Sequence, residues 1–93
     1  IADLDNIAVG AMRAVQDAGY TVPEDVSFIG YGNTNASLVC RPALTSTQIN
    51  MYDSGRMAVQ RLVDMLDHPE RHAACTTFVS SELVLRDSVR EIA

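Results

Sequence analysis

Side chains that commonly bind metals or act as nucleophiles are few in this 93-residue chain and lie far apart in the sequence. Cys40 and Cys75 have no partner at metal-ligand spacing. His68 and His72 are four residues apart, but no glutamate or third ligand accompanies them in a zinc-site pattern. We therefore expect no metal site, and we expect both cysteines to be ordinary thiols in a reducing cytoplasm.

Catalytic side chains are equally hard to assemble. The chain has no lysine, which removes Schiff-base chemistry and the lysine of phosphate-binding loops. The paired carboxylates Glu24 and Asp25 lie in an expected surface turn, and Ser80 and Ser81 lack the context of a nucleophile elbow. The sequence accordingly predicts no catalytic residue, no enzyme activity and no cofactor.

Polar side chains that could bind a ligand without reacting follow the first expected strand. Residues 26–31, with the sequence VSFIGY, are β-branched and aromatic with a glycine near the end, which predicts a short buried strand. In α/β folds, ligands gather at the carboxyl ends of strands. The segment from Gly30 to Asn35 is therefore the first place where we expect a binding site.

A helix precedes this strand and must hold it in place. Asp3 and Asp5 offer N-cap oxygens, and we expect the helix to end at Gly19. A helix, a turn at residues 20–25 and a buried strand are typical of an α/β fold with a parallel sheet. The apolar stripe of the helix consists of Ile7, Ala8, Ala11, Met12, Val15 and Ala18.

The second half of the chain predicts another helix and another strand. Residues 33–42 look irregular, and residues 43–48 predict a short extended segment. A helix is expected over residues 53–66, followed by a proline-containing polar surface loop at 68–72 and a last strand at about 76–85. The apolar face of this helix consists of Met57, Ala58, Leu62, Met65 and Leu66.

The composition is that of a globular chain, with 47% hydrophobic and 20% charged residues and a formal net charge of −5. Its arginines are spread along the sequence, so no basic stripe is available for a phosphate backbone. No stretch approaches the roughly 18 apolar residues of a membrane span, and nothing near Ile1 resembles a signal peptide. We expect these residues neither to contact DNA nor to enter a membrane.

Four sequence blocks stand out: DNIAVGAMRA at residues 5–14, VPEDVSFIGY at 22–31, PALTS at 42–46 and ELVLRDS at 82–88. Each block alone is a weak signal. Together, in this order and at this spacing, they resemble the C-terminal third of transcriptional regulators of the LacI/GalR family, and the resemblance covers essentially the whole chain.

The resemblance implies part of a type I periplasmic-binding-protein-like domain, an α/β fold with parallel strands flanked by helices. By that analogy, residues 1–43 belong to the C-terminal subdomain, 44–50 to a crossover, 51–85 to the N-terminal subdomain, and 86–93 to the return crossover and C-terminus. It also implies a small-molecule effector such as a sugar or nucleoside, a homodimer, and operator DNA bound through a headpiece that these residues do not contain.

Several family contacts to the effector are replaced in this sequence. The usual Asn-Asp pair before the first helix is Leu4-Asp5, the usual Asp after the aromatic strand end is Gly32, and a frequent Gln aligns with Ile49, one residue after Gln48. An offset of one residue turns a side chain to the opposite face of an extended segment. Either the ligand is less hydroxylated than a sugar or the effector response is weak or absent. The effector-binding candidates are Asp5, Gly32, Asn33 and Ile49.

Some of these polar residues also have purely structural interpretations. Asp5 at a helix N-terminus would stabilise the helix dipole by about 0.3–1 kcal/mol, and we expect this to be its main role. Asn33 follows a glycine, so an Asx turn and a ligand contact are both open. Arg86 is expected to be a structural ion-pair partner or carbonyl ligand.

The resemblance places a dimer interface on the first helix and on the loop that leads to Pro42, at Val9, Met12, Val39 and Cys40. Val9 and Met12 lie partly off the main apolar stripe, and a second apolar strip requires a second surface to cover it. The alternative is that two layers of the same subunit bury the helix on both sides.

The sequence thus predicts the effector-sensing and dimerising portion of a cytoplasmic, LacI-family DNA-binding regulator, expected to be a repressor. In such a protein, effector binding would shift the relative position of two DNA-binding heads. The alternative is a periplasmic sugar-binding protein of an uptake system, which shares the fold. A small α/β enzyme has no supporting residues.

The 93-residue polypeptide by itself is expected to bind duplex DNA no better than a generic acidic protein, because it has no lysine and no basic stripe. A mobility-shift assay at micromolar protein checks this expectation. Salt-sensitive retardation of the duplex would contradict it.

Overall fold

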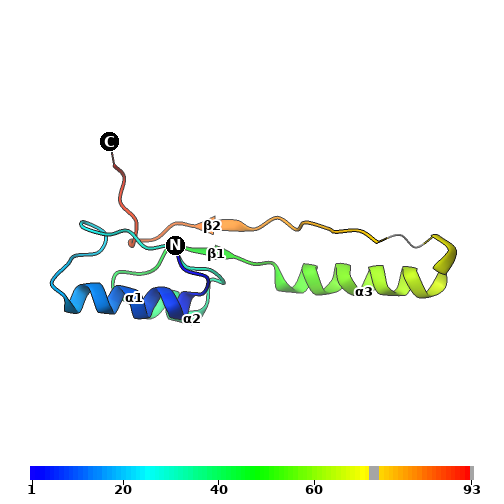
Figure 1. The fold of residues 1–93 in the computed structure, drawn as a ribbon, viewed down its shortest axis with the longest axis horizontal. Helices are drawn as coiled ribbons and strands as arrows, with labels where there is room; N and C mark the ends of the chain where they lie inside the picture. The colour runs from blue at the N-terminus through cyan, green and yellow to red at the C-terminus, as the bar shows by residue number, and fades with distance from the viewer. Residues whose placement is uncertain (72–73, 93) are drawn as a thin grey trace. The chain divides into compact units, whose positions relative to one another are not determined.

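The computed structural model describes residues 1–71 and 74–92. In chain order, its elements are α1 (Asp5–Asp17), α2 (Asn35–Val39), β1 (Ser46–Gln48), α3 (Met51–Asp67), the 3-10 turn η1 (Pro69–Arg71) and β2 (Glu82–Val84) (Figure 1). They divide into two compact units: residues 1–49 with 81–93 form unit 1, and residues 50–80 form unit 2.

Helix α1 begins at Asp5 and closes with a glycine cap. Gly19 has a φ of 95° and donates its N–H to the carbonyl of Gln16 at 3.0 Å. The N–H of Tyr20 donates to the carbonyl of Val15, also at 3.0 Å. This is the Schellman pattern, and it confirms the expected end of the helix. The expected aspartate N-cap is wrong, because the N-cap residue is Leu4 and no side chain caps the helix.

The buried face of α1 is rotated relative to the expected apolar stripe. Asp5, Ala8 and Met12 are buried, whereas Ile7 is 55% exposed. The face turns this way because the carboxylate of Asp5 is held inside unit 1, and residues at three- and four-residue spacing follow it. The core of unit 1 consists of Ala8, Met12, Val22 and Leu44, with Ala2, Val9, Val15, Phe28 and Cys40 packed against it.

The first expected strand lies between two other extended segments. The N–H groups of Gly30 and Gly32 donate to the carbonyls of Thr45 and Thr47, each at 2.9 Å. On the other side of residues 26–31, the N–H of Ala2 donates to the carbonyl of Ile29 at 2.9 Å. Three stretches that are far apart in the sequence therefore run side by side.

The expectation of a buried strand at residues 26–31 is only partly met. The segment forms one isolated parallel bridge, Ile29 with Thr45, and no longer strand. Val26 is 37% exposed and Tyr31 is 43% exposed, because the core that covers the segment is small. Only Gly30 of this segment is buried.

Strands β1 and β2 pair antiparallel, with Ser46 opposite Val84 and Gln48 opposite Glu82. The last strand was expected over residues 76–85, but β2 has only three residues. It is short because its partner β1 ends where the chain turns toward α3. The parallel sheet expected from the sequence is represented in the described residues by the isolated bridge alone.

The stretch expected to be irregular, residues 33–42, contains the helix α2. A five-residue helix is little more than one turn, so it leaves no apolar periodicity in the sequence. The buried residue of this helix is Ser37, whose hydroxyl donates to the carbonyl of Thr34 at 2.6 Å.

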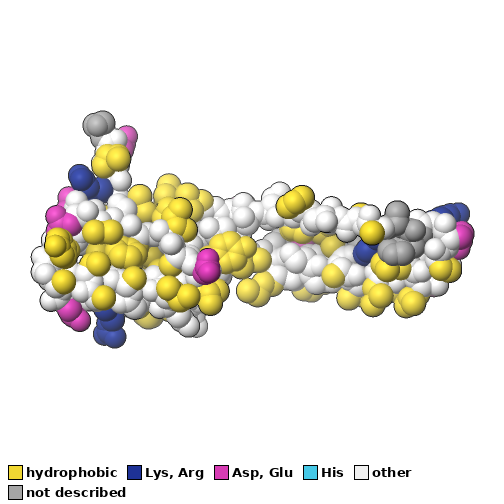
Figure 2. All heavy atoms as spheres, viewed as in Figure 1, with side chains coloured by type: hydrophobic (Ala, Val, Ile, Leu, Met, Phe, Trp, Pro, Cys, Tyr) yellow, Lys and Arg dark blue, Asp and Glu magenta, His cyan; other side chains and the backbone are white. Residues whose placement is uncertain are grey.

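Unit 2 is built on α3, whose N-cap is the side chain of Asn50, which accepts from the N–H of Asp53 at 3.2 Å. Helix α3 covers the expected range and ends before Pro69. The 3-10 turn η1 lies in the polar loop expected at residues 68–72. The last residue of that loop, His72, lies outside the described residues. None of the described residues of α3 is buried, and Figure 2 shows hydrophobic side chains exposed along this helix. Leu62 and Leu66, on the predicted apolar face, are 53% and 72% exposed.

Replacing Gly30 with alanine should destabilise unit 1 by about 1–3 kcal/mol, the usual cost of overpacking. A Cβ there would meet Oδ1 of Asp5 and would lie 2.7 Å from Cδ2 of Leu44. The measurement is the thermal midpoint of the full-length protein.

The matched control is Gly10→Ala, since a Cβ at Gly10 in α1 meets nothing within 4 Å. Alanine is the better helix former by roughly 0.5–1 kcal/mol, so this variant should melt at or above the wild-type midpoint. Equal midpoints for the two variants would show that the close approach at Gly30 has no energetic weight.

Candidate functional site

The candidate binding site lies where three neighbouring extended segments of unit 1 end. The backbone bonds between these segments include Asp5 N–H to the Tyr31 carbonyl at 3.1 Å and Gly32 N–H to the Thr47 carbonyl at 2.9 Å. Gly32 takes part in one of these bonds, Leu4 directly precedes Asp5, and Ile49 follows Thr47 by two residues. This is the strand-end location expected for a ligand in an α/β fold.

The carboxylate of Asp5 is the most buried acidic group of unit 1, with no exposed surface. Its Oδ2 accepts hydrogen bonds from the backbone N–H and the hydroxyl of Thr34, at 2.6 and 2.9 Å. Its Oδ1 accepts a hydrogen bond from the hydroxyl of Ser46 at 2.6 Å. Asp5 does lie in the first turn of α1, where an acidic side chain favours the helix dipole, and its carboxylate also ties α1 to the two segments beside it.

Asn33 uses its side chain on neighbours within the chain. Its Nδ2 donates to Oε1 of Gln48 at 2.5 Å, and its Oδ1 accepts from the guanidinium of Arg86. Its backbone N–H donates to the hydroxyl of Ser46 at 3.0 Å. Both ends of the Asn33 amide are therefore bonded within the chain, and a contact of Asn33 with a ligand stays a prediction.

Arg86 is a carbonyl ligand, as expected. Its Nη1 donates to the carbonyl of Leu44 at 2.7 Å and to the hydroxyl of Ser37 at 3.0 Å. Its backbone N–H donates to the hydroxyl of Thr45 at 2.9 Å. The guanidinium thereby joins the segment after β2 to α2 and to Asn33.

Ser88 performs a similar function closer to the C-terminus. Its buried hydroxyl accepts from the N–H of Thr45 at 2.8 Å and donates to the carbonyl of Phe28 at 2.6 Å. Thr34, Ser46 and Ser88 were not among the expected site residues. The only signal for Ser46 and Ser88 was their position inside two of the four sequence blocks that carry the family resemblance, because a lone serine has no pattern that indicates burial.

Hydrophobic side chains are also exposed near this site. Leu4 is 54% exposed, Tyr31 is 43% exposed and Ile49 is half-buried. Gly32 has a φ of 114°, a conformation that L-residues rarely adopt. Gln48 is also exposed, and its Nε2 donates to the carbonyl of Ile49 at 3.1 Å.

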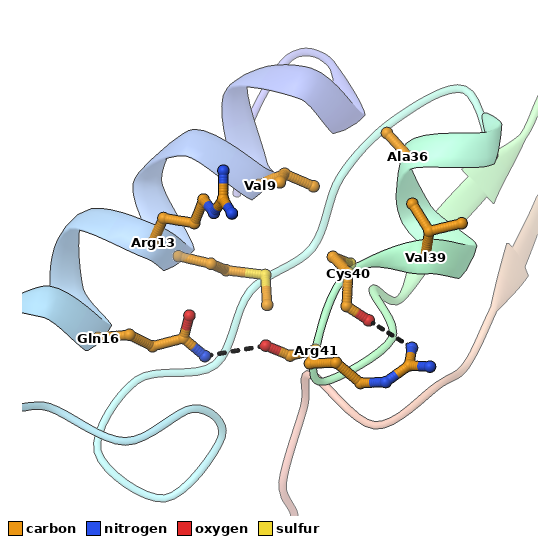
Figure 3. Close-up of a pocket in the computed structure, with 8 residues that line it drawn as sticks. Val9, Arg13, Gln16, Ala36, Val39, Cys40 and Arg41 are labelled. Carbon is orange, nitrogen blue, oxygen red and sulfur yellow. Dashed lines mark hydrogen bonds between the residues drawn. The ribbon is translucent and has the colours of Figure 1, made fainter.

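A second feature of unit 1 is a groove of about 480 Å³ between α1 and α2. In Figure 3, side chains from the two helices face each other across it, and Gln16 donates to the carbonyl of Arg41 at 2.9 Å. All four dimer-interface candidates line this groove, but Met12 is only 1% exposed and belongs to the core. The lining consists of Val9, Met12, Arg13, Gln16, Ala36, Val39, Cys40 and Arg41.

In residues 1–71 and 74–92, no group of three or more His, Cys, Asp or Glu side chains is placed to hold a metal ion. Cys40 and Cys75 are free thiols. No helix in this described part of the chain is long and apolar enough to cross a membrane.

Residues 1–89 match the model of the periplasmic binding protein-like domain family. The chain is 36% identical over 89 residues to the HTH-type transcriptional repressor PurR of Mannheimia succiniciproducens, covering 96% of this chain. The chain spans about a quarter (26%) of the length of that relative.

Solved structures of transcriptional regulators have the same fold. The lac repressor dimer bound to operator and an anti-inducer superposes with a TM-score of 0.81 at 28% identity, covering 95% of this chain and 31% of that one. A complex of the transcriptional regulator CelR with cellobiose gives a TM-score of 0.82 at 27% identity, covering 94% and 27%.

Replacing Asp5 with asparagine should destabilise unit 1 by about 1.5–3 kcal/mol, because an amide nitrogen would replace one oxygen that now accepts buried hydrogen bonds. Thermal denaturation of the full-length protein measures the effect. Asp3→Asn is the control, since Asp3 is exposed, and it should stay within about 0.5 kcal/mol of wild type. Equal losses in both variants would contradict the proposed importance of the buried carboxylate.

Proposed function

The chain belongs to the LacI family of transcriptional regulators, and we propose that it forms part of the effector-sensing and dimerising domain of a regulator of the repressor type. The observation that carries the proposal is that nearly all of the chain shares its fold with the lac repressor bound to operator. The PurR relative, also a repressor, supports the sign of regulation.

The effector would be a small molecule at the strand ends around Gly32, Asn33 and Ile49. Operator DNA would be bound by a headpiece outside these residues, and a protein that acts on an operator works in the cytoplasm. Residues 1–43 and 51–85 would belong to the C-terminal and N-terminal subdomains, with crossovers at 44–50 and 86–93. The boundaries of the two compact units, after residues 49 and 80, lie close to these crossovers and support the assignment.

The alternative of a periplasmic sugar-binding protein shares the fold, but the relatives reported above are regulators of transcription and do not favour it. Those relatives are not enzymes. The buried polar side chains of unit 1 also bond to one another and to backbone groups, and none of those in the described residues lacks a partner. These observations support a binding role over a catalytic one.

Dimerisation would use the groove between α1 and α2. Val39 is 74% exposed on α2, while Val9 and Cys40 are half-buried beside it. An apolar surface of this kind is stabilised when a second copy covers it, and a twofold interface presents the same surface on both copies. Since Met12 lies in the core, it would support this surface from below and would not be a contact residue.

Full-length protein should enrich defined, twofold-related sequences from a library of genomic DNA fragments, and a small molecule from the cell extract should shift their affinity. Sequencing of the bound fragments measures the first effect, and titration with fractionated extract measures the second. Binding that is uniform over all fragments would contradict the proposed function.

The substitution Val39→Asp should convert dimers to monomers at micromolar concentration, because a twofold axis brings two like charges together at a cost of several kcal/mol. Light scattering measures the mass. Ala14→Asp is the control, because Ala14 is an exposed residue of α1 that does not line the groove. An unchanged dimer mass for a folded Val39→Asp variant would place the interface elsewhere.

A further inference from the structure

We propose that Arg86 is a positioning residue that links Asn33 to the groove between α1 and α2, so that a change at Asn33 alters the affinity of one copy of the chain for another. This inference rests on the proposed function, which places a second copy in that groove. It follows from where the guanidinium of Arg86 makes its hydrogen bonds and from how α2 is anchored.

Helix α2 is anchored in unit 1 through its one buried residue, Ser37. The hydroxyl of Ser37 accepts from Nη1 of Arg86 at 3.0 Å and donates to the carbonyl of Thr34 at 2.6 Å. The carbonyl of Ser37 accepts from the N–H of Leu44 at 2.8 Å. A helix of five residues has little stability of its own, so these bonds determine where α2 lies.

The position of α2 in turn sets the shape of the groove. Ala36, Val39 and Cys40, from α2 and its C-cap, line one side of it, and Figure 3 shows them facing the side chains of α1. The α1 side includes Met12, which is 1% exposed and fixed in the core. A shift of α2 would therefore change the surface that a second copy has to match.

The guanidinium of Arg86 connects this helix to a residue that does not line the groove. While Nη1 bonds to Ser37 and to the carbonyl of Leu44, Nη2 donates to Oδ1 of Asn33. The hydroxyl of Ser37 approaches the same Oδ1 directly, but at 3.5 Å, the limit of a hydrogen bond. Because the guanidinium is a rigid plane, its two arms cannot move independently, and a displacement of Asn33 is passed on to Ser37.

Coupling of this kind is reciprocal. A small molecule that displaces the amide of Asn33 would change the affinity between two copies, and dimerisation would restrain the amide. The amide is also bonded to Gln48 of β1, at 2.5 Å, so a movement of that strand would reach α2 by the same route.

A double-mutant cycle on the full-length protein tests the link. Asn33→Gly removes the acceptor and suits the positive φ of 50° at this position. Arg86→Lys keeps the charge but replaces the planar fork with one ammonium group, and it leaves the bond from Leu44 to Ser37 in place. The dissociation constant of the dimer is measured by analytical ultracentrifugation.

We expect each single variant to weaken the dimer about five- to ten-fold, at the low end of the range for coupled sites. The double variant should be no weaker than Arg86→Lys alone, within about two-fold, because both substitutions break the same contact. An unchanged dimer in Asn33→Gly would overturn the proposal. So would effects that multiply in the double variant, because the two residues would then act independently.

Hydrogen exchange of the monomers, at concentrations below the dissociation constant, separates positioning of α2 from general loss of structure. Arg86→Lys should speed the exchange of residues 35–40 and leave that of α1 unchanged. Faster exchange in both helices would overturn the proposal. Arg90→Lys is the matched control at an exposed arginine outside the groove, and a dimer weakened as much as in Arg86→Lys would overturn the proposal too.

The proposed interface is read separately, from Val39→Asp. Monomers in Val39→Asp, together with an unchanged dissociation constant in Asn33→Gly, would retain the interface and overturn the link. An intact dimer in a folded Val39→Asp variant would place the interface elsewhere and overturn the proposal with it.

Discussion

The organisation of unit 1 depends on burying the carboxylate of Asp5. A charged acceptor taken out of water must be hydrogen-bonded on both oxygens, and here the donors come from Thr34 and Ser46, far along the chain. The same requirement explains why Gly30 has no side chain, because a Cβ there would meet the carboxylate. It also sets the rotation of α1, whose buried face runs from Asp5 through Ala8 to Met12.

In unit 1, hydrogen bonds from side chains hold neighbouring segments together where other α/β domains have a longer β-ladder. β1 and β2 have three residues each, and the parallel pairing of Ile29 with Thr45 is a single bridge. The hydroxyl of Ser88 links the two segments that form this bridge, because it accepts from the N–H of Thr45 and donates to the carbonyl of Phe28. Buried hydroxyl and carboxylate groups thus connect segments whose backbones share few hydrogen bonds.

This use of polar side chains has a functional consequence at the strand ends. Groups that would be candidates for sugar recognition in an α/β fold are engaged in holding the segments together, as Asn33 is by Arg86 and Gln48. The groove between α1 and α2 is a separate apolar surface of the same unit, and its proposed occupant is a second copy of the chain.

The sequence by itself determined the two long helices, the glycine that ends α1, the proline that follows α3, and the family, because these depend on local backbone preferences and on four ordered blocks. It also predicted a structural role for Arg86, as an ion-pair partner or a carbonyl ligand, and the second is confirmed. Only the tertiary structure decided the roles of Asp5, Asn33 and Ser88, the core position of Met12, and the short extents of β1 and β2. Those features depend on which distant segment lies beside each residue. The sequence pattern around Asp5 is the same whether its carboxylate caps a helix or is buried against a serine 41 residues away.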